Sequence, residues 1–232
     1  MTKKFSIILF TALVFMMLLV MVYFLYNADV IPKPVKSAES FGIETVKSSV
    51  DFNSNGVDDY TEIMLGARED ALNMPEYNGD YVEGGYPPDD VGVCTDLVWR
   101  AFKKAGYSLK DMLDRDISLY PSDYPDAYPP DSNIDFRRVK NLKVFFEKYA
   151  QSLTTNIQSI EEWQPGDIVI FGEDSHIGIV SDKRNNDGQT FILHNAGQKN
   201  REQDYLKKHK PTAHYRFDAA KIPHKVLCAW AD

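Results

Sequence analysis

Three short apolar runs in the second half of the chain decide its predicted fold. They are WQPGDIVIF at residues 163–171, SHIGIV at 175–180 and QTFILHN at 189–195. Each run is rich in β-branched and aromatic residues, which favour strands. The link around 172–175 and the loop containing NNDG at 185–188 are both short and rich in turn-forming residues. We therefore expect three strands in an antiparallel meander.

Two histidines stand at neighbouring ends of these predicted strands. His176 opens the second strand and His194 closes the third. Because paired antiparallel strands bring such ends side by side, we expect His194 to hydrogen-bond the imidazole of His176 and to fix its tautomer. Asn195 is expected to face the opposite side of the sheet. The pair is suited to acid–base catalysis, and the alternative is that both histidines are structural.

A cysteine lies where a loop rich in glycine and proline is predicted to become a helix, in the stretch GVCTDLVWRAF at residues 92–102. Apolar residues then recur at helical spacing, and Gly106 is a predicted stop. Free amides at a helix start stabilise a thiolate and an oxyanion, so Cys94 is expected to have a lowered thiol pKa. Two alternatives stay open: Cys94 is a small core residue, or it forms a disulfide with Cys228, whose apolar neighbours otherwise place it in the core.

The order of these motifs carries a resemblance to a known superfamily. A helix-start cysteine followed by PGDIV, HIGIV and LH resembles the NlpC/p60-type papain-like cysteine peptidases of bacterial cell walls. The resemblance implies an α+β fold, with a papain-like core of helices packed on a small antiparallel sheet. It also implies that Cys94 is the nucleophile, His176 the base and His194 the residue that orients the base.

A second resemblance is closer and covers the chain from Glu76 to Phe217. Four stretches are similar to a bacterial envelope family known as domain of unknown function 1287: residues 92–96, 134–142, 194–197 and 214–216. This chain departs from that family's pattern at Phe136 and Lys140, where the family tends to have histidine and proline. The departure leaves the cysteine and the two histidines in place.

Residues 51–62, DFNSNGVDDYTE, fit the EF-hand loop pattern at every required position. Gly56 permits the sharp turn of such a loop, whereas Asp58 stands where an apolar residue is usual. The alternative is an Asx-rich turn that caps a helix starting near Tyr60. The sequence predicts one weak, structural Ca²⁺ site, with ligands from Asp51, Asn53, Asn55, Val57 (through its carbonyl), Asp59 and Glu62.

The N-terminal region differs in character from the rest. Residues 5–26 form an uncharged run of 22 residues, which at about 1.5 Å per residue can cross a hydrocarbon core of about 30 Å. Two lysines precede it, so residues 1–4 are expected to be a cytoplasmic tip and the rest to be extracytoplasmic. The length of the run favours a single-pass anchor over a cleaved signal peptide. Residues 27–50 are expected to be a stalk that becomes weakly helical towards Val50, and residues 63–232 the catalytic domain.

Composition limits the class of protein and its partners. The chain has 232 residues, 44% of them hydrophobic, and a formal net charge of −8, which suits one or two globular domains and excludes a disordered chain. The acidic balance, without a Lys/Arg-rich run, argues against a nucleic-acid partner. Two cysteines are too few for a disulfide scaffold, and no C-x-x-C spacing supports a zinc site.

Several further residues are candidates with weaker signals. Asp96 is expected to favour the amino terminus of its helix. Arg137 and Arg138 are expected to form surface ion pairs, the alternative being that they anchor a substrate carboxylate. We expect an upstream tyrosine, Tyr81 or Tyr86, to donate a hydrogen bond to the oxyanion. We assign no role to His209, His214 and His224. A helix is expected over 139–149 and a surface loop rich in proline and tyrosine over 120–130.

Together these expectations describe a membrane-anchored, extracytoplasmic cysteine hydrolase that cleaves amide bonds through a thioester and needs no cofactor for catalysis. The substrate implied by the resemblance and the location is a peptide of cell-wall peptidoglycan. An alternative from a different class is a non-catalytic envelope-binding module with the same fold. A third possibility is an acyl or peptidyl transferase that uses the same thioester.

Overall fold

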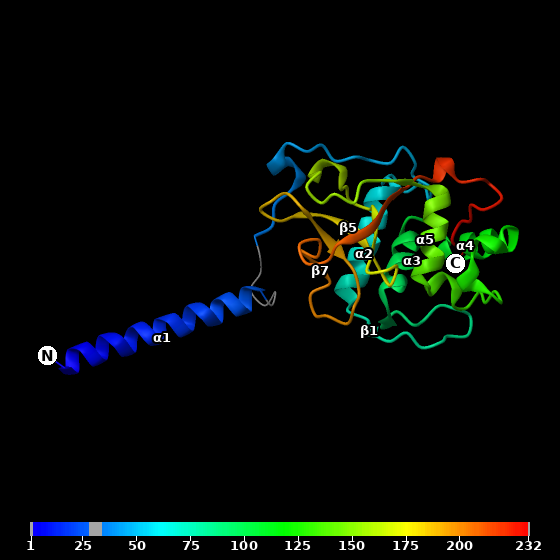
Figure 1. Cartoon of the computed structure of the whole chain (residues 1–232). Coiled ribbons are helices and arrows are strands. Elements are labelled where there is room, and N and C mark those ends of the chain that lie inside the picture. Colours follow the sequence, from blue (N-terminus) through cyan, green and yellow to red (C-terminus); the bar gives the residue numbers. More distant parts are fainter. Residues whose placement is uncertain (1, 28–33, 232) are drawn as a thin grey trace. The chain divides into compact units, whose positions relative to one another are not determined.

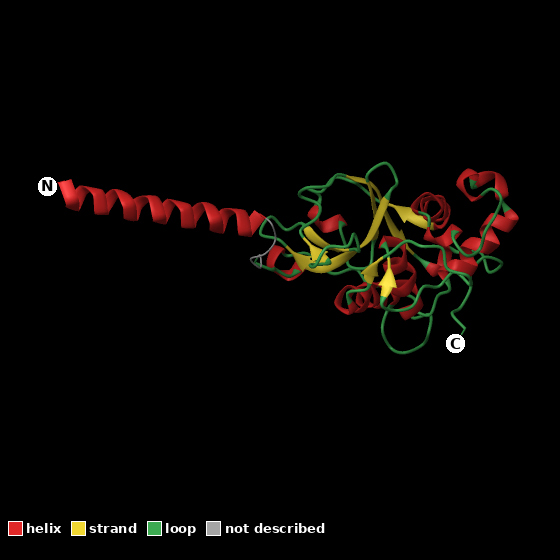
Figure 2. Cartoon of the chain, turned by 90° about the horizontal axis from the view of Figure 1, so that it is seen from below, coloured by secondary structure: helices red, strands yellow, loops and turns green. Residues whose placement is uncertain are grey.

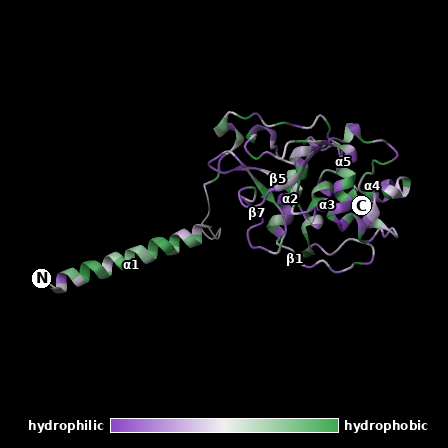
Figure 3. Cartoon of the chain, viewed as in Figure 1, coloured by the Kyte–Doolittle hydropathy of each residue, from purple (hydrophilic) through white to green (hydrophobic). Residues whose placement is uncertain are grey.

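The structure, a computed structural model, describes residues 2–27 and 34–231. It divides into two units, one ending at Val35 and one beginning at Lys36. In the first unit, α1 (Thr2–Asn27) carries exposed apolar side chains along its length (Figure 3). The span Lys4–Tyr26 is long and apolar enough to cross a membrane, a property that signal sequences share. The predicted tip includes Met1, which lies outside the described residues.

The second unit contains the predicted meander as the middle of a larger antiparallel sheet. Its three strands, β4 (Ile168–Phe171), β5 (His176–Arg184) and β6 (Thr190–Leu193), are consecutive in the chain and adjacent in the sheet. Ile168 lies opposite Ile179, and Ile179 opposite Leu193. The prediction of an α+β fold with a small antiparallel sheet is thereby confirmed. In spatial order the six strands are β3 (Ala150–Ser152), β8 (Pro211–Phe217), β4 (Ile168–Phe171), β5 (His176–Arg184), β6 (Thr190–Leu193) and β7 (Glu202–Gln203).

Four helices of the second unit gather beside this sheet (Figures 1 and 2). They are α2 (Asp59–Asn73), α3 (Cys94–Lys104), α4 (Leu109–Leu119) and α5 (Val139–Tyr149). Helices α2 and α3 cross very closely, because Gly66 has no side chain: a Cβ there would lie 2.6 Å from Lys104 Cβ. A short parallel pair, β1 (Glu76–Tyr77) and β2 (Val91–Gly92), precedes α3.

The core explains why β4 is apolar at every position. Ile168 and Ile170 point into a large cluster with the helices, whereas Val169 and Phe171 point into a smaller cluster around Trp163 on the other face. A strand in the middle of the sheet is buried on both sides, and its side chains alternate between them. The run of four apolar residues therefore fixes β4 as a central strand, and the strand beside it, β5, begins with His176.

Segments of 3₁₀ helix complete the unit. The predicted proline- and tyrosine-rich loop contains two of them, and Tyr124 between them is buried. The six segments are η1 (Ala38–Phe41), η2 (Pro121–Asp123), η3 (Pro125–Ala127), η4 (Asp135–Arg137), η5 (Ile160–Glu162) and η6 (Ala219–Lys221).

The predicted stalk needs correction. Residues 28–33 lie outside the described part, but from Lys36 onward the segment packs along the second unit. Lys36 bridges to Arg184, and the side chain of Gln164 accepts a 3.0 Å hydrogen bond from the amide of Val46. Residues 43–50 form no helix, and the one helical turn in the segment is η1, earlier in the chain.

The helices predicted after Cys94 and over 139–149 are confirmed as α3 and α5, and the helix expected near Tyr60 is α2. Two apolar residues of α2, Leu65 and Leu72, are exposed, at 37% and 77%. The buried positions are instead Tyr60, Ile63 and Met64, with others further along. The close crossing with α3 selects this face.

Candidate active site

Cys94 is the first residue of α3, as predicted, and it is 6% exposed. The amides of Thr95 and Ile177 are within hydrogen-bonding reach of its sulfur. Ile177 directly follows His176, so the start of β5 lies against Cys94. Cys94 and Cys228 are both free, so the alternative of a disulfide is wrong.

The pKa of the Cys94 thiol is raised, whereas the sequence predicted a lowered one. Burial raises the pKa of Cys94 to about 11, and the nearby amides only partly offset this effect. The helix start does supply donors, as the sequence suggested. However, the packing of β5 over α3 removes water from the sulfur, and desolvation of the charged form is the larger effect. Cys94 is therefore a neutral thiol at pH 7 in this structure.

The side chains of His176 and His194 are within hydrogen-bonding distance of each other, as predicted. His176 Nε2 lies 3.0 Å from His194 Nδ1, and the two rings are nearly perpendicular. Gly178 makes this approach possible, because a Cβ there would lie 2.8 Å from the Leu193 carbonyl oxygen and 3.1 Å from His194 Cβ. The expected pairing of strand ends is thus present in the structure.

A glutamine that the sequence did not single out completes the chain of hydrogen bonds. Gln203 Oε1 lies 3.2 Å from His194 Nε2. Gln198 Nε2, an amide donor, lies 3.2 Å from both ring nitrogens of His194. The contact with Gln203 Oε1, which only accepts, favours a proton on His194 Nε2, so that His194 Nδ1 accepts from His176 Nε2 and from Gln198. His176 Nδ1 is then left with a free lone pair. Burial lowers the pKa of His176 to about 4 and that of His194 to about 3, which keeps both rings neutral at pH 7.

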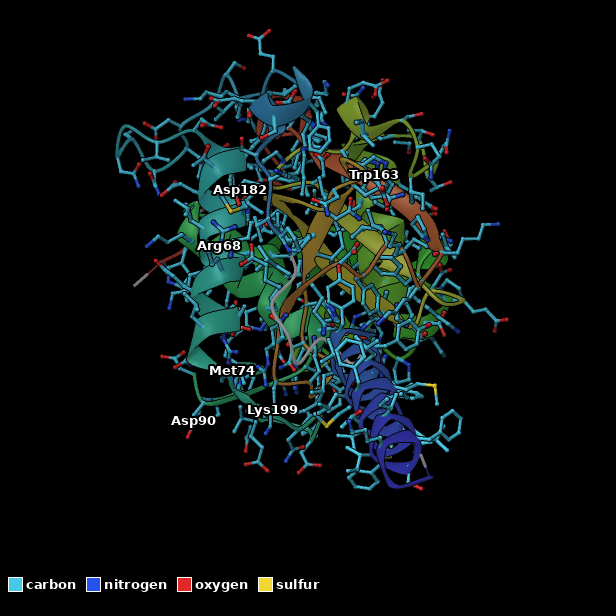
Figure 4. All side chains as sticks on the ribbon, turned by 90° about the vertical axis from the view of Figure 1, so that its left-hand side faces the viewer. Arg68, Met74, Asp90, Trp163, Asp182 and Lys199 are labelled. Carbon is cyan, nitrogen blue, oxygen red and sulfur yellow. The ribbon has the colours of Figure 1, made fainter. Side chains whose placement is uncertain are left out.

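Helix α2 holds the edge strand that carries Gln203. Arg68 donates to Glu202, the neighbour of Gln203, at 2.5 Å and also pairs with Asp182 in β5. Figure 4 shows Arg68 and Asp182 side by side. Burial opposes ionisation of Glu202, but donors from Arg68 and Lys183 hold its pKa below the usual value. A two-residue strand is thereby fixed by a partly exposed ionic cluster.

Tyrosines flank the nucleophile, although they are not the predicted ones. The ring of Tyr205 packs against His194, with centroids 4.2 Å apart, and stacks on His209 at 3.7 Å. Burial raises the pKa of the hydroxyl groups of both Tyr77 and Tyr205, and the charge of a Cys94 thiolate would raise it further. The sequence offered no signal for either residue, since each lies in or beside a very short strand.

The predicted oxyanion tyrosines have other roles. The hydroxyl of Tyr81 donates to Asp131 and accepts from Asn133. Tyr86 packs among aromatic core residues, which are Trp99, Phe136 and Trp230. Neither hydroxyl is paired with a group at Cys94.

Two cavities meet at Ser175, one on each side of the candidate catalytic residues. The first, of about 620 Å³, is lined by Cys94, Thr95, Tyr77 and Arg138, among others. The second, of about 710 Å³, is lined by residues that include His176, Tyr205 and Lys210. A substrate can therefore approach the sulfur from one cavity and the imidazole from the other.

Asp96 and Arg137 form a buried pair rather than surface contacts. Both side chains are at most 1% exposed, and Arg137 donates through Nε and Nη2 to the two oxygens of Asp96, at 2.9 and 3.0 Å. Asp96 also accepts from the amide of Val93, just before Cys94. Arg138, in contrast, is partly exposed and pairs with Asp135. The expectation of surface pairs is right for Arg138 only.

The PGD motif has a structural explanation. Asp167 accepts from Arg216 at 2.7 Å and lies 3.0 Å from His214 Nε2. The ring of His214 stacks on Trp163, with centroids 4.0 Å apart. Asp167 therefore ties β4 to β8, and His214 is structural.

The predicted calcium loop has two parts. The side-chain amides of Asn53 and Asn55 donate to Glu62 at 2.8 and 2.6 Å, and Asp51 accepts from main-chain amides of the loop. Asp58 caps α2 by accepting from Thr61, as the alternative interpretation expected. Asp59 is turned into the core, where it accepts 2.5 and 2.9 Å hydrogen bonds from the Tyr107 hydroxyl and the Phe52 amide. Of the predicted ligands, Asp59 is therefore turned away from the loop, whereas the side chains of Asp51, Asn53, Asn55 and Glu62 bond to groups within it.

His, Cys, Asp and Glu side chains alone do not build a metal site here. Within residues 2–27 and 34–231 no three of them are grouped in a way that could hold an ion. Any calcium site in the loop would therefore depend on amide and main-chain oxygens as well as on Asp51 and Glu62. Calcium accepts such ligands.

Comparison with known proteins places the chain in a family. A model of the family described as "Domain of unknown function (DUF1287)" matches residues 64–217, which include Cys94, His176, His194 and Gln203. The chain is 35% identical over 165 residues to "Uncharacterized protein YijF" of Escherichia coli (strain K12), covering 67% of this chain and 80% of that protein. No solved structure matches. The chain belongs to the DUF1287 family.

Proposed function

We propose that the protein is a cysteine hydrolase of amide bonds, with Cys94 as nucleophile and His176 as base. The observation that carries the proposal is the hydrogen-bonded series from Gln203 through His194 to His176, which leaves the Nδ1 lone pair of His176 free. The motif order of NlpC/p60-type peptidases supports it, as does a papain-like arrangement of a helix-start cysteine and a strand-borne histidine. Such chemistry requires a nucleophile and a base close together, and Cys94 and His176 line adjoining cavities that share Ser175.

The reaction starts from neutral groups. Sγ of Cys94 attacks the substrate carbonyl carbon while His176 Nδ1 takes the thiol proton. The amides of Thr95 and Ile177, which lie near the sulfur, are placed to stabilise the negative charge that develops. The C–N bond then breaks as His176 returns its proton to the leaving amine. A thioester remains on Cys94.

Water completes the cycle. His176 Nδ1 removes a proton from water as its oxygen attacks the thioester carbonyl, and the C–S bond breaks as Cys94 regains a proton from His176. His194 keeps the ring of His176 in place throughout, and Gln203 keeps His194 in the required tautomer. Neither residue exchanges a proton with the substrate.

The proposed substrate is a peptide of cell-wall peptidoglycan. Support comes from α1, which is long and apolar enough to span a membrane, and from the two lysines before its apolar run, which favour export of the second unit. We propose a single-pass membrane anchor with residues 36–232 outside the cytoplasm. We also propose that Ca²⁺ binds the loop at 51–62 and stabilises the start of α2, because Glu62 is 1% exposed and its present partners are uncharged amides.

One observation favours a second candidate function. The pKa of Cys94, raised by burial to about 11, is unusual for a resting nucleophile and is expected in a non-catalytic envelope-binding module. The two functions differ in turnover. Full-length protein in detergent micelles should release amines from peptidoglycan stem peptides, and Cys94→Ala and His176→Ala should each abolish release. A folded wild-type protein that binds the peptides without cleaving them would support the module instead.

A further inference from the structure

Asn195 connects the end of β6 to the stretch of chain that leads into Cys94. Its side-chain Nδ2 donates a 2.9 Å hydrogen bond to the carbonyl oxygen of Gly92, which lies 103 positions away in the sequence. Its Oδ1 accepts from the amide of Gly197 at 3.0 Å. The orientation of the side-chain amide is therefore determined by an acceptor at one end and a donor at the other. Asn195 is fully buried, at 0% exposed, so this bridge is shielded from water.

The other side-chain contacts of this stretch come from α3. Among the described residues, Arg100 and Asp96 also bond to the backbone of residues 91–93. Arg100 donates to the first carbonyl and Asp96 accepts from the last amide, each at 2.8 Å. Both residues belong to the helix that begins at Cys94, so these contacts fix the stretch relative to that helix. Asn195 fixes it relative to the sheet.

The stretch has little room to move. A Cβ on Gly92 would lie 3.0 Å from Asp96 Cβ and 2.9 Å from Arg100 Nη1. Strand β1 pairs with it on a further side. A shift of the Gly92 carbonyl would therefore displace Cys94, which follows two residues later. Without the amide of Asn195 the buried carbonyl would lose this donor, and a buried carbonyl without a partner is costly unless water reaches it.

We infer that Asn195 is a positioning residue, which holds Cys94 at a fixed place relative to the His176–His194 pair. His194 contributes both links: its ring contacts that of His176 at 3.0 Å, and its main chain leads directly to Asn195. From there one hydrogen bond and two residues of backbone lead to Cys94. Asn195 exchanges no proton in the reaction. The inference rests on the proposed function for its effect on turnover, but not for its effect on the thiol.

The reactivity of the Cys94 thiol tests this role without a substrate. Full-length protein that carries Cys228→Ala has Cys94 as its one remaining cysteine. In this background Asn195→Ala is expected to admit water beside the sulfur, which lowers the thiol pKa from its raised value of about 11. The rate of alkylation by iodoacetamide at pH 8 should rise about threefold for each unit by which the pKa falls, because the gain in thiolate exceeds the loss in nucleophilicity.

Asn195→Asp makes the effect reversible. A protonated carboxyl group can donate to the Gly92 carbonyl as the amide does, whereas the ionised group only accepts. The charged side chains that contact the neighbouring backbone, Asp96 and Arg100, are already in ion pairs, and burial favours the protonated form. The ratio of the variant rate to the wild-type rate should therefore be close to one at pH 4.5 and rise towards the Asn195→Ala value as the carboxyl group ionises.

A dipyridyl disulfide measures this ratio from pH 4.5 to 8.5, because it reacts with thiols in acid as well as at neutral pH. In Asn195→Ala the ratio should stay raised at every pH. A loss of stability alone would not be reversed by acid. Equal ratios for Asn195→Ala and Asn195→Asp at pH 4.5 would contradict the role of the donated hydrogen bond.

Asn141→Ala is the matched control. Asn141 is 1% exposed and donates at 3.1 Å to the carbonyl of Asp135, so its loss removes the same kind of buried hydrogen bond. It is not among the described residues that line the two cavities. Urea unfolding should show similar losses of stability in Asn141→Ala and Asn195→Ala, but only the second should raise the reactivity of Cys94. Equal rises in both variants would mean general loosening and would overturn the inference.

Turnover separates this inference from the proposed function. If the wild-type protein cleaves amides, Asn195→Ala is expected to lower kcat about tenfold or more with little change in KM, because misplaced atoms slow the chemical step rather than binding. Unchanged thiol reactivity in Asn195→Ala would overturn the inference even in an active hydrolase. Raised reactivity, restored by Asn195→Asp in acid, would support the positioning of Cys94 by Asn195 even in a protein that cleaves no amide, and the absence of cleavage would contradict the proposed hydrolase.

Discussion

His176 Nε2 and His194 Nδ1 are 3.0 Å apart, and this contact decides which atom of His176 can act as a base. With the proton on His194 Nε2, as the contact with Gln203 Oε1 favours, the proton between the two rings belongs to His176 Nε2. The remaining nitrogen of His176, Nδ1, is the one with a free lone pair. The positions of His176 at the start of β5, of His194 after β6 and of Gln203 on β7 therefore favour the His176 tautomer that has its proton on Nε2.

Replacing Gln203 tests the tautomer directly. Gln203→Leu leaves the His194 Nε2–H without its acceptor, and kcat/KM is expected to fall about tenfold, with little change in KM. Gln203→Glu places a carboxylate beside His194 and should raise the pKa of the acid limb of the pH–rate profile. Profiles from pH 4 to 9 measure both effects. A profile that is the same in all three proteins would contradict a role for Gln203.

The buried histidines predict how stability depends on pH. Both pKa values are lowered by burial, to about 4 and about 3, from an ordinary value of 6.5. Below pH 6.5 the unfolded chain therefore binds more protons than the native state, and the free energy of unfolding falls as the pH drops from about 6.5 towards 4. Urea unfolding at pH 4.5, 5.5 and 7.5 measures this. His176→Asn should flatten the dependence, whereas exposed His224→Asn should not.

The Asp96–Arg137 pair supports the start of α3. Arg137→Ala would leave the carboxylate of Asp96 buried without its bidentate partner, which is expected to cost about 3–5 kcal/mol of stability. The adjacent Arg138→Ala is a matched control, because its pair is partly exposed and is worth about 1 kcal/mol or less. Chemical denaturation compares the two variants. Equal losses would mean that burial of the Asp96–Arg137 pair does not matter.

Calcium should stabilise the protein if the loop at 51–62 binds it. At ten times its dissociation constant the ion would add about 1.4 kcal/mol to the free energy of unfolding, and Tm would rise by about 3 °C. Glu62→Gln should remove the rise, whereas Glu69→Gln, on the exposed side of the same helix, should keep it. Thermal scans in millimolar Ca²⁺ and in chelator make the comparison. Identical Tm values for wild type in both buffers would leave the loop as a helix cap alone.

Much of the fold and part of the site follow from local sequence signals. The meander was predictable because apolar runs alternate with turn residues, and the start of α3 because a glycine- and proline-rich loop meets a helical pattern. The His176–His194 contact followed from strand order. These features depend on residues close together in the chain or on the pairing of adjacent strands.

The remaining features depend on contacts between distant segments. Gln203 lies on a two-residue strand that is fixed by Arg68 from α2, and no periodicity marks it. The raised pKa of Cys94 results from burial under β5, which outweighs the local effect of the helix start. The path of the chain between Lys36 and Val46 depends on Arg184 and Gln164, more than a hundred residues away. None of these contacts leaves a local pattern.

The most direct test of the central claim is a search for an acyl group on Cys94 during turnover. Full-length protein is mixed with peptidoglycan stem peptides, quenched in acid within seconds, digested and examined by mass spectrometry. The account predicts an adduct on the peptide that contains Cys94, removable by hydroxylamine as a thioester is, together with release of one amine for each amide cleaved. A folded protein that leaves the peptides intact, with Cys94 unmodified at every time point, would contradict it.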